Sequence, residues 1–369
     1  MLPLNWQRVR LGDIGKPCMC KRVMKHQTTR YGEIPFYKIG TFGNTADAFI
    51  SKELFLEYKT KYSFPKKGDI LISASGTIGR AVIYDGKPAY FQDSNIVWID
   101  NDETLVKNDF LFYAYSNVKW NTEHTTILRL YNDNFRNTLI PLPPLNEQSA
   151  IANILSALDR YLCALDALIL KKEGVKKALS FELLSQRKRL KGFNQTWQRV
   201  RLGDIANYLI SNLSVEQITQ QGKIKVYDVN NFIGYTDTTF ISDKPYISIV
   251  KDGSVGRVRI LPPKTNILST MGALIANHKT TTEFLFYLLS NFDFKNFTSG
   301  SIIPHIYFKD YKEKTIFLPP LNEQSAIANI LSDLDNEIAS LKNKKCQFEN
   351  IKKALNHDLM SAKIRVLKK

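Results

Sequence analysis

The chain has 369 residues, of which 44% are hydrophobic and 23% are charged. This balance is that of an ordinary globular protein, which excludes collagen-like, low-complexity and wholly disordered chains. Lysine and arginine number 51 against 35 aspartate and glutamate, so the net charge is +16. An excess of this size predicts a polyanionic partner, with nucleic acid as the first candidate and an anionic membrane surface as the second.

The sequence gives no indication of a membrane or secreted protein. It has no run of about 18 apolar residues, and its first residues lack the layout of a signal peptide. The four cysteines match neither a zinc-site spacing nor a disulfide framework: Cys18, Cys20, Cys163 and Cys346. We therefore expect a cytoplasmic protein with reduced thiols, no bound metal and no membrane partner.

An internal repeat organises the chain. The segment Trp6–Ile14 recurs unchanged as Trp197–Ile205, and Leu142–Ser156 recurs unchanged as Leu318–Ser332. Between these constant blocks the two halves share little, and the second insert is shorter. Identical frames around divergent inserts indicate that the frames do one job twice, whereas the inserts do two different jobs.

Each longer constant block is predicted to open a long helix. A pair of prolines bars helix upstream, Asn146 and Asn322 stand where an N-cap is expected, and Glu147 and Glu323 follow in the first turn. Downstream, apolar residues step by four and three, the spacing of a heptad seam, over a helix of about 40 residues and roughly 60 Å. The predicted seam residues are Ile151, Leu155, Leu158, Leu162, Leu165, Ile327, Leu331, Leu334, Ile338 and Leu341.

Such a narrow apolar stripe requires a partner, and the other copy within the same chain is the obvious one. We interpret the two helices as an intramolecular antiparallel pair that acts as a spacer between the variable domains. A generic helical hairpin or a homodimeric coiled coil is the alternative.

The two inserts are rich in Tyr, Phe, Ile, Val and Thr and have turns at Gly-Asp, Asp-Gly and Ser-Gly. We expect short strands at Asp69–Ser73, Ala81–Tyr84 and Ile96–Ile99 and short helices near Phe110–Ser116 and Glu283–Leu289. The predicted fold class is α+β: two mixed α/β domains with twisted sheets, a long antiparallel coiled coil, and a pseudo-twofold internal repeat. The expected boundaries are 1–141 and 192–317 for the variable domains, and 142–191 and 318–369 for the helices.

Basic and aromatic residues interleave in the inserts, as is typical of nucleic-acid binding. The loop Ser75–Arg80 offers small residues, a hydroxyl and an arginine, and Asp252–Arg257 is its counterpart. The structural alternative for each loop is a glycine-bearing hairpin turn with a solvated arginine. The candidate DNA-binding residues are Lys21, Arg22, Lys25, Arg30, Ser75, Thr77, Arg80, Arg129, Tyr131, Lys251, Ser254, Arg257, His305 and Tyr307.

Catalytic motifs are not found in the sequence. The proline pairs stand in Leu-Pro-Pro-Leu and Leu-Pro-Pro-Lys, which differ from the Asn/Asp-Pro-Pro-aromatic motif of an adenine methyltransferase. Neither a glycine-rich cofactor loop nor a P-loop occurs. Asp47 with Glu57 and Lys59 resembles a nuclease metal site only at loose spacing. We therefore predict a binding protein with no catalytic residues, no metal and no cofactor of its own.

Three stretches resemble one protein family. Leu142-Pro-Pro-Leu-Asn-Glu-Gln-Ser-Ala-Ile151 is similar to the signature that opens the conserved helices of Type I restriction–modification specificity (S) subunits. The junction Leu184–Phe193 followed by Trp197–Ile205, and the C-terminal Leu359–Val366, also resemble that family. The resemblance covers essentially the whole chain.

The resemblance implies that each variable domain is a target recognition domain that reads one half of a bipartite site in double-stranded DNA. It implies that the helices set the half-site spacing and dock two modification (methyltransferase) subunits. S-adenosylmethionine, ATP and Mg are then expected only on partner subunits, the modification subunits and the restriction (R) subunits. Arg129 pairs by position with His305, so equivalent positions are not expected to contact equivalent bases.

Two other functions are compatible with the charge and the helices. One is a non-catalytic coiled-coil scaffold that binds nucleic acid without sequence preference. The other is a self-sufficient nuclease or methyltransferase, which the missing motifs disfavour.

Overall fold

A computed structural model describes residues 3, 5–124 and 128–366. The chain divides into two compact units: unit 1 contains 1–165 and 344–369, and unit 2 contains 166–343. Each unit contains about half of both long helices together with one variable domain. Among the described residues, no helix is both long and apolar enough to cross a membrane.

Unit 1 is built from short, mostly antiparallel strands. Its four-stranded sheet has the order β2 (Gly15–Met19), β8 (Ile96–Asn101), β5 (Ile70–Ser73) and β6 (Ala81–Ile83). A three-stranded sheet has the order β4 (Phe49–Ile50), β3 (Ile34–Tyr37) and β7 (Tyr90–Phe91), with β3 parallel to β7. Two pairs complete the strands: β1 (Gln7–Arg10) with β11 (Leu139–Leu142), and β9 (Glu123–His124) with β10 (Leu128–Arg129).

Unit 2 repeats this topology strand for strand. Its four-stranded sheet has the order β13 (Ala206–Ile210), β19 (Met271–Ala276), β16 (Tyr246–Val250) and β17 (Val258–Leu261). Its three-stranded sheet has the order β15 (Phe232–Thr236), β14 (Ile224–Tyr227) and β18 (Thr265–Ile267), again with one parallel pair. The two pairs are β12 (Gln198–Arg201) with β22 (Thr315–Leu318), and β20 (Thr298–Ser299) with β21 (His305–Ile306).

Short helices complete each unit. Unit 1 has α1 (Leu11–Ile14), α2 (Lys52–Lys61), α3 (Asn108–Tyr115) and α4 (Asn132–Asn137). Unit 2 has α6 (Thr282–Ser290) and α7 (Phe308–Tyr311). The predicted strands and short helices are confirmed to within two residues at their ends, and the predicted α+β class is confirmed.

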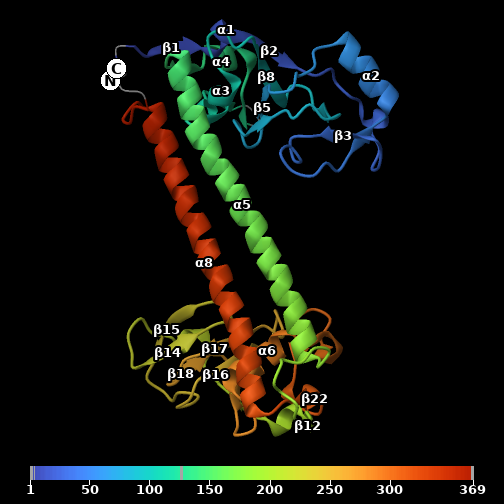
Figure 1. The fold of residues 1–369 in the computed structure, drawn as a ribbon, viewed down its shortest axis with the longest axis vertical. Helices are drawn as coiled ribbons and strands as arrows, with labels where there is room; N and C mark the ends of the chain where they lie inside the picture. Colours follow the sequence, from blue (N-terminus) through green and yellow to red (C-terminus); the bar gives the residue numbers. More distant parts are fainter. Residues whose placement is uncertain (1–2, 4, 125–127, 367–369) are drawn as a thin grey trace. The chain divides into compact units, whose positions relative to one another are not determined.

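Two long uninterrupted helices, α5 (Leu145–Leu184) and α8 (Leu321–Met360), have 40 residues each (Figure 1). Both begin one residue before the asparagine expected as N-cap, so Asn146 and Asn322 lie in the first turn. There each side chain accepts a hydrogen bond from the next residue's N–H. Each helix therefore begins at the leucine that directly follows the proline pair, Leu145 or Leu321.

The two helices pair antiparallel within each unit. In unit 1 the rings of Tyr161 and Phe348 are 4.7 Å apart, and Asp159 pairs with Lys352. In unit 2 Lys172 pairs with Glu337 at 2.8 Å. The residue number falls on one helix as it rises on the other, so the chain pairs its own helices as expected.

The predicted seam residues are buried or half-buried, but not all of them serve the helix pair alone. Ile151 and Leu155 belong to the apolar core of unit 1, together with Leu359 and Met360 from the end of α8. Ile327 and Leu331 occupy the equivalent place in the core of unit 2. Each unit therefore packs its sheets and short helices against its own part of the two long helices.

Candidate DNA interface and repeated helix contacts

The loop between β5 and β6 requires glycine at one position. Gly79 has φ +82°, and a Cβ added there would lie 2.1 Å from the indole nitrogen of Trp120. In unit 2, Gly256 has φ +81°, and its Cβ would lie 2.6 Å from the ring of Phe294. Both loops are thus held against an aromatic side chain, and both place an exposed arginine immediately after the glycine.

A second loop in unit 1, Gln92–Asn95, collects predicted residues from distant parts of the chain. The Asn95 side-chain oxygen accepts hydrogen bonds from the Ser75 hydroxyl at 2.8 Å and from the Arg129 guanidinium at 3.1 Å. The Asp93 carboxylate binds Arg22 at 3.0 Å. Ser75 is buried, so its hydroxyl supports the loop from inside the protein.

Asp93 and Asn95 were missed by the sequence analysis. They follow the buried strand β7 in a polar stretch, Gln-Asp-Ser-Asn, that carries no basic residue. No local pattern marks them, because their partners Arg22 and Arg129 are far away in sequence. Only the fold brings these four side chains to one surface loop.

Unit 2 has different chemistry at the equivalent place. Asp252 forms a β-bridge with His305, and the His305 ring nitrogen lies 2.7 Å from the Asp252 carboxylate. In unit 1 the corresponding bridge joins Ser75 to Arg129. The two frames therefore bring together the same two segments but present an arginine–asparagine pair in one unit and a histidine–aspartate pair in the other.

The remaining predicted residues lie mainly at the surface. The ammonium of Lys21 lies 5.0 Å from the centre of the Tyr62 ring, and Arg80 donates a hydrogen bond to the carbonyl of Phe42 at 2.9 Å. Lys251 is half-buried. The others are exposed: Lys25, Arg30, Thr77, Tyr131, Ser254, Arg257 and Tyr307.

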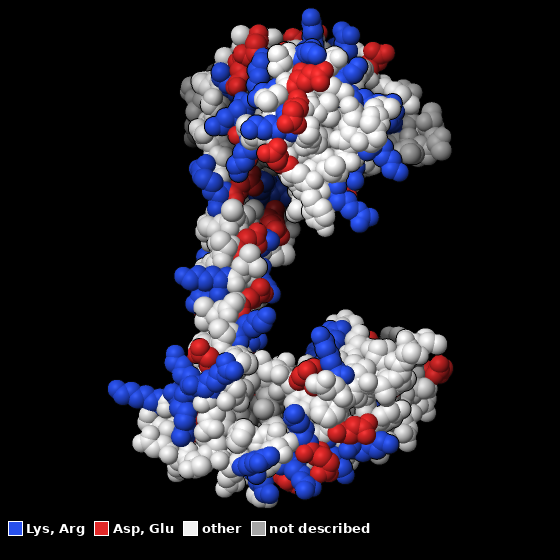
Figure 2. Space-filling model, turned by 90° about the vertical axis from the view of Figure 1, so that its right-hand side faces the viewer, with Lys and Arg blue, Asp and Glu red and all other residues white. Residues whose placement is uncertain are grey.

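Lysine and arginine are spread over the face shown in Figure 2 and interspersed with acidic residues rather than gathered in one patch. Charge alone therefore does not outline a binding site. Specific side chains on the loops are needed to define one.

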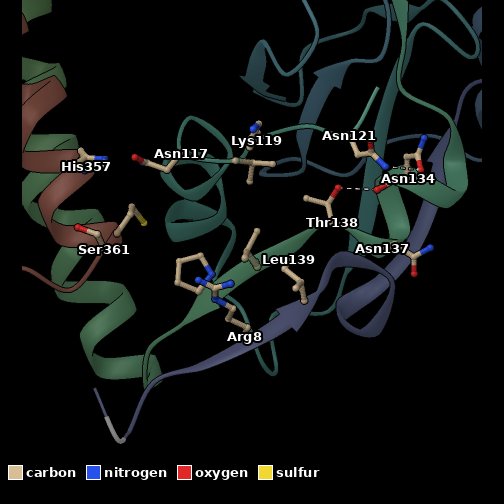
Figure 3. Close-up of a pocket in the computed structure, with 14 residues that line it drawn as sticks. Arg8, Asn117, Lys119, Asn121, Asn134, Asn137, Thr138, Leu139, His357 and Ser361 are labelled. Carbon is tan, nitrogen blue, oxygen red and sulfur yellow. Dashed lines mark hydrogen bonds between the residues drawn. The ribbon is translucent and has the colours of Figure 1, made fainter. Parts of the chain in front are cut away.

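A cavity of about 610 Å³ in unit 1 is lined by amide and basic side chains (Figure 3). Asn117, Asn121 and Asn137 line it together with Lys119, and His357 comes from α8. The described residues that line it include no aspartate or glutamate.

The acidic residues considered for a nuclease site are engaged elsewhere. Asp47 pairs with Lys38 at 2.8 Å, and Glu57 pairs with Lys61 at 3.0 Å. Among the described residues, no cluster of His, Cys, Asp and Glu could hold a metal ion.

The Glu-Gln pair of the constant block anchors the start of each long helix to the domain in its own unit. In unit 1 the Glu147 carboxylate accepts a hydrogen bond from the Trp6 indole at 3.0 Å and two from Arg365. Gln148, fully buried, accepts from the Lys107 backbone N–H and donates to the Leu105 carbonyl. The N-terminal and C-terminal segments thus meet at one carboxylate.

Unit 2 contains the same anchor. Glu323 accepts hydrogen bonds from the Trp197 indole at 3.0 Å and from Arg189. Gln324 binds the backbone of Lys279 and Thr281 ahead of α6. Arg189, from the segment after α5, therefore does for unit 2 what Arg365, from the segment after α8, does for unit 1.

A tyrosine–aspartate–lysine contact is also repeated. In unit 1 the Tyr113 hydroxyl donates to Asp159 at 2.7 Å, and Lys352 pairs with the same carboxylate. Burial is the main cause that raises the pKa of Tyr113, and the adjacent Asp159 adds to it. The phenol therefore remains a hydrogen-bond donor at neutral pH.

In unit 2 the Tyr287 hydroxyl donates to Asp335 at 2.9 Å, and Lys176 pairs with that carboxylate. A cavity borders each contact, about 630 Å³ beside Asp159 and about 390 Å³ beside Asp335. The two cavities share residue types at equivalent positions, so a similar surface occurs once in each unit.

These features define a duplicated α+β protein with two different surface-loop sets on identical frames. The chain belongs to the family described as the Type I restriction modification DNA specificity domain, whose model matches residues 3–172 and 194–350. The resemblance inferred from the constant blocks is thereby confirmed, and the chain contains two such DNA specificity domains.

Three relatives bear names of type I restriction enzyme specificity subunits. One from Haemophilus influenzae is 64% identical over 148 residues, which cover 40% of this chain and 38% of that protein. MjaVIII from Methanocaldococcus jannaschii is 25% identical over 409 residues, covering 99% of this chain and 94% of that protein. MjaX from the same organism is 29% identical over 335 residues, covering 81% and 79%.

Two solved structures share the fold. The S subunit of a Type-I restriction-modification system from M. genitalium has a TM-score of 0.64 at 21% identity, covering 97% of this chain and 98% of that chain. A chain from a study of complex assembly in the type I R-M system has a TM-score of 0.60 at 17% identity, covering 99% and 100%.

Proposed function

We propose that this chain is the non-catalytic subunit that gives a Type I restriction–modification complex its DNA sequence specificity. Each recognition domain reads one half of an asymmetric, split site. The observation that carries the proposal is the contrast between frame and loops. Glu147 and Glu323 hold equivalent contacts, whereas the loop contact Ser75–Asn95–Arg129 is replaced by Asp252–His305.

The chemistry of the two loop sets supports different targets. Arginine makes bidentate contacts with guanine, and asparagine with adenine, whereas histidine and aspartate offer other donor and acceptor patterns. Two dissimilar readers joined through one scaffold would recognise an asymmetric sequence. The continuous 40-residue helices would set the gap between its halves.

The duplicated frame supports two copies of one partner. The equivalent cavities beside Asp159 and Asp335 are suited to the same segment of two methyltransferase subunits. These partners would supply S-adenosylmethionine and the methyl transfer, and restriction subunits would supply ATP-dependent cleavage with Mg. Native mass spectrometry of the chain with its methyltransferase should give two such subunits per chain.

Selection from a pool of random duplexes tests the recognition itself. The full chain should enrich a split motif whose binding survives raised salt and competition from unrelated DNA. Arg129→Ala should relax the motif in one half, and Arg257→Ala in the other. Enrichment of no motif, or methyl transfer by the chain alone, would contradict the proposal.

A second function has one observation in its favour. The dispersed basic side chains in Figure 2 suit a scaffold that binds nucleic acid without sequence preference. Such binding depends chiefly on phosphate contacts, so it would vanish as salt rises and show no motif in the same selection.

A further inference from the structure

The hairpin of β20 and β21 carries two bulky apolar side chains at its tip. Ile302 is 93% exposed and Ile303 is 54% exposed, and Pro304 follows them. Adjacent isoleucines in water are unfavourable for an isolated domain. Their exposure marks a contact surface more specifically than a scattered apolar residue would.

The hairpin is held firmly at its base, so the tip does not fold back onto the domain. Ile306 is buried, and its backbone N–H donates to the Lys251 carbonyl at 2.9 Å. The Gly253 N–H donates to the Pro304 carbonyl at 2.9 Å. Gly300 has φ +91°, and a Cβ there would lie 2.3 Å from the Ile303 carbonyl oxygen, so the turn itself depends on glycine.

The surroundings of the tip are polar and basic. The hairpin is bonded to the loop that carries exposed Ser254 and Arg257. Directly after β21, Tyr307 is exposed, and the ammonium of Lys309 lies 5.5 Å from its ring centre. An apolar tip on a hairpin bonded to a loop with an exposed arginine complements DNA, which combines phosphate charge with one apolar group on its base edges, the thymine methyl.

A two-stranded hairpin is narrow enough to enter the major groove, where thymine methyl groups are displayed. We propose that Ile302, supported by Ile303, contacts a thymine methyl group and makes thymine part of the half-site read by the second recognition domain. This inference rests on the proposed function and adds a specificity-determining residue to it.

Uracil substitution tests the contact directly, because uracil differs from thymine only by the methyl group. The probe is the duplex that the full wild-type chain enriches, with each thymine of the second half-site replaced by uracil in turn. At one position wild-type binding should weaken about fourfold, the effect of one buried methyl group. Ile302→Ser should bind the thymine duplex about fourfold or more weakly and should be indifferent to that uracil.

Leu170→Ser is the matched control, since Leu170 is an exposed apolar residue on α5. It should keep wild-type affinity and uracil sensitivity. Equal melting temperatures of the variants and the wild type would show that folding is unaffected.

Three results would overturn the inference while the proposed function stands: a second half-site without thymine, wild-type indifference to every uracil, or unchanged uracil sensitivity in Ile302→Ser. Loss of methyltransferase binding with intact DNA selection would also overturn it, by making the tip a protein contact. Failure of the wild-type chain to enrich any split motif would instead remove the proposed function itself.

Discussion

The guanidinium of Arg365 donates two hydrogen bonds to the carboxylate of Glu147, from Nε to Oε1 at 2.6 Å and from Nη2 to Oε2 at 2.9 Å. The Glu147 side chain is 2% exposed and that of Arg365 is 30% exposed. A bidentate pair of this kind fixes orientation as well as position. The C-terminal segment is therefore part of the recognition domain formed by the N-terminal residues.

Arg365→Ala should destabilise unit 1 by about 2–3 kcal/mol, because among the described residues it leaves the buried Glu147 carboxylate with the Trp6 indole alone as a partner. Urea denaturation followed by tryptophan fluorescence measures the loss. Lys363→Ala is the control, since its ammonium is exposed and 3.6 Å from Asp358, and it should change stability by less than about 1 kcal/mol. Equal effects of the two substitutions would contradict this role of Arg365.

Tyr113→Phe and Tyr287→Phe should each cost about 1–2 kcal/mol, because each removes a hydrogen bond to a carboxylate that remains paired with lysine. The two losses should be similar, as expected for a duplicated frame. Tyr31→Phe, at a ring that is 87% exposed, should be neutral. Chemical denaturation measures the free energy of unfolding of the three variants. An unchanged value for Tyr113→Phe would contradict a stabilising contact between Tyr113 and Asp159.

Gly79→Ala and Gly76→Ala separate backbone strain from steric clash. Gly76 also has positive φ, +65°, but the nearest atom to its added Cβ is 3.7 Å away. Gly76→Ala should cost about 1–2 kcal/mol from strain alone. Gly79→Ala should cost more and relax selection in the first half-site, because Trp120 must move. Indistinguishable melting temperatures would show that the indole yields freely.

Cysteine labelling should discriminate between buried and exposed thiols. Burial raises the pKa of Cys20 to about 12, so at pH 8 this residue remains a thiol and is a poor nucleophile. Cys163 and Cys346 are exposed. Iodoacetamide at pH 8 should label both while sparing Cys20 in the folded protein, as peptide mass spectrometry would detect. Labelling of Cys20 before unfolding would contradict its burial.

Removal of one heptad from each helix, residues 163–169 and 341–347, should shorten the preferred gap between half-sites by about 3 base pairs. Seven residues correspond to about 10 Å of helix, and base pairs are about 3.4 Å apart. Deletion from α5 alone should disrupt folding, since the contacts of Asp159 and Asp335 could not both remain in register. Duplex selection with an unchanged gap would reject the helices as a spacer.

Much of the architecture could be predicted because the relevant signals are local. The stepping of Ile151, Leu155 and Leu158 indicates a heptad helix, and the unchanged repeat of Leu142–Ser156 indicates a second copy. The role of Glu147 could not be predicted. Its position in the first turn suggests only a favourable interaction between its carboxylate and the helix dipole. In the folded chain, however, the side chain is buried between Trp6 and Arg365.

The residues of the candidate DNA surface were likewise predictable from the sequence only in part. Composition and loop chemistry pointed to basic residues such as Arg22 and Arg129, but not to Asp93 and Asn95, which orient them. Ile302 was also missed, because an apolar residue in sequence carries no information about its exposure.

The duplicated plan, the long helices, their apolar stripes and the family can be read from the sequence, because each is recorded in the order of residues within short stretches of the chain. The folded chain alone shows where the compact units divide, which polar groups meet within each unit and which apolar side chains face water. Those outcomes depend on contacts between residues that are distant in sequence, from 34 positions for Asn95 and Arg129 to 218 for Glu147 and Arg365, and the energies of these contacts exist only once the chain has folded.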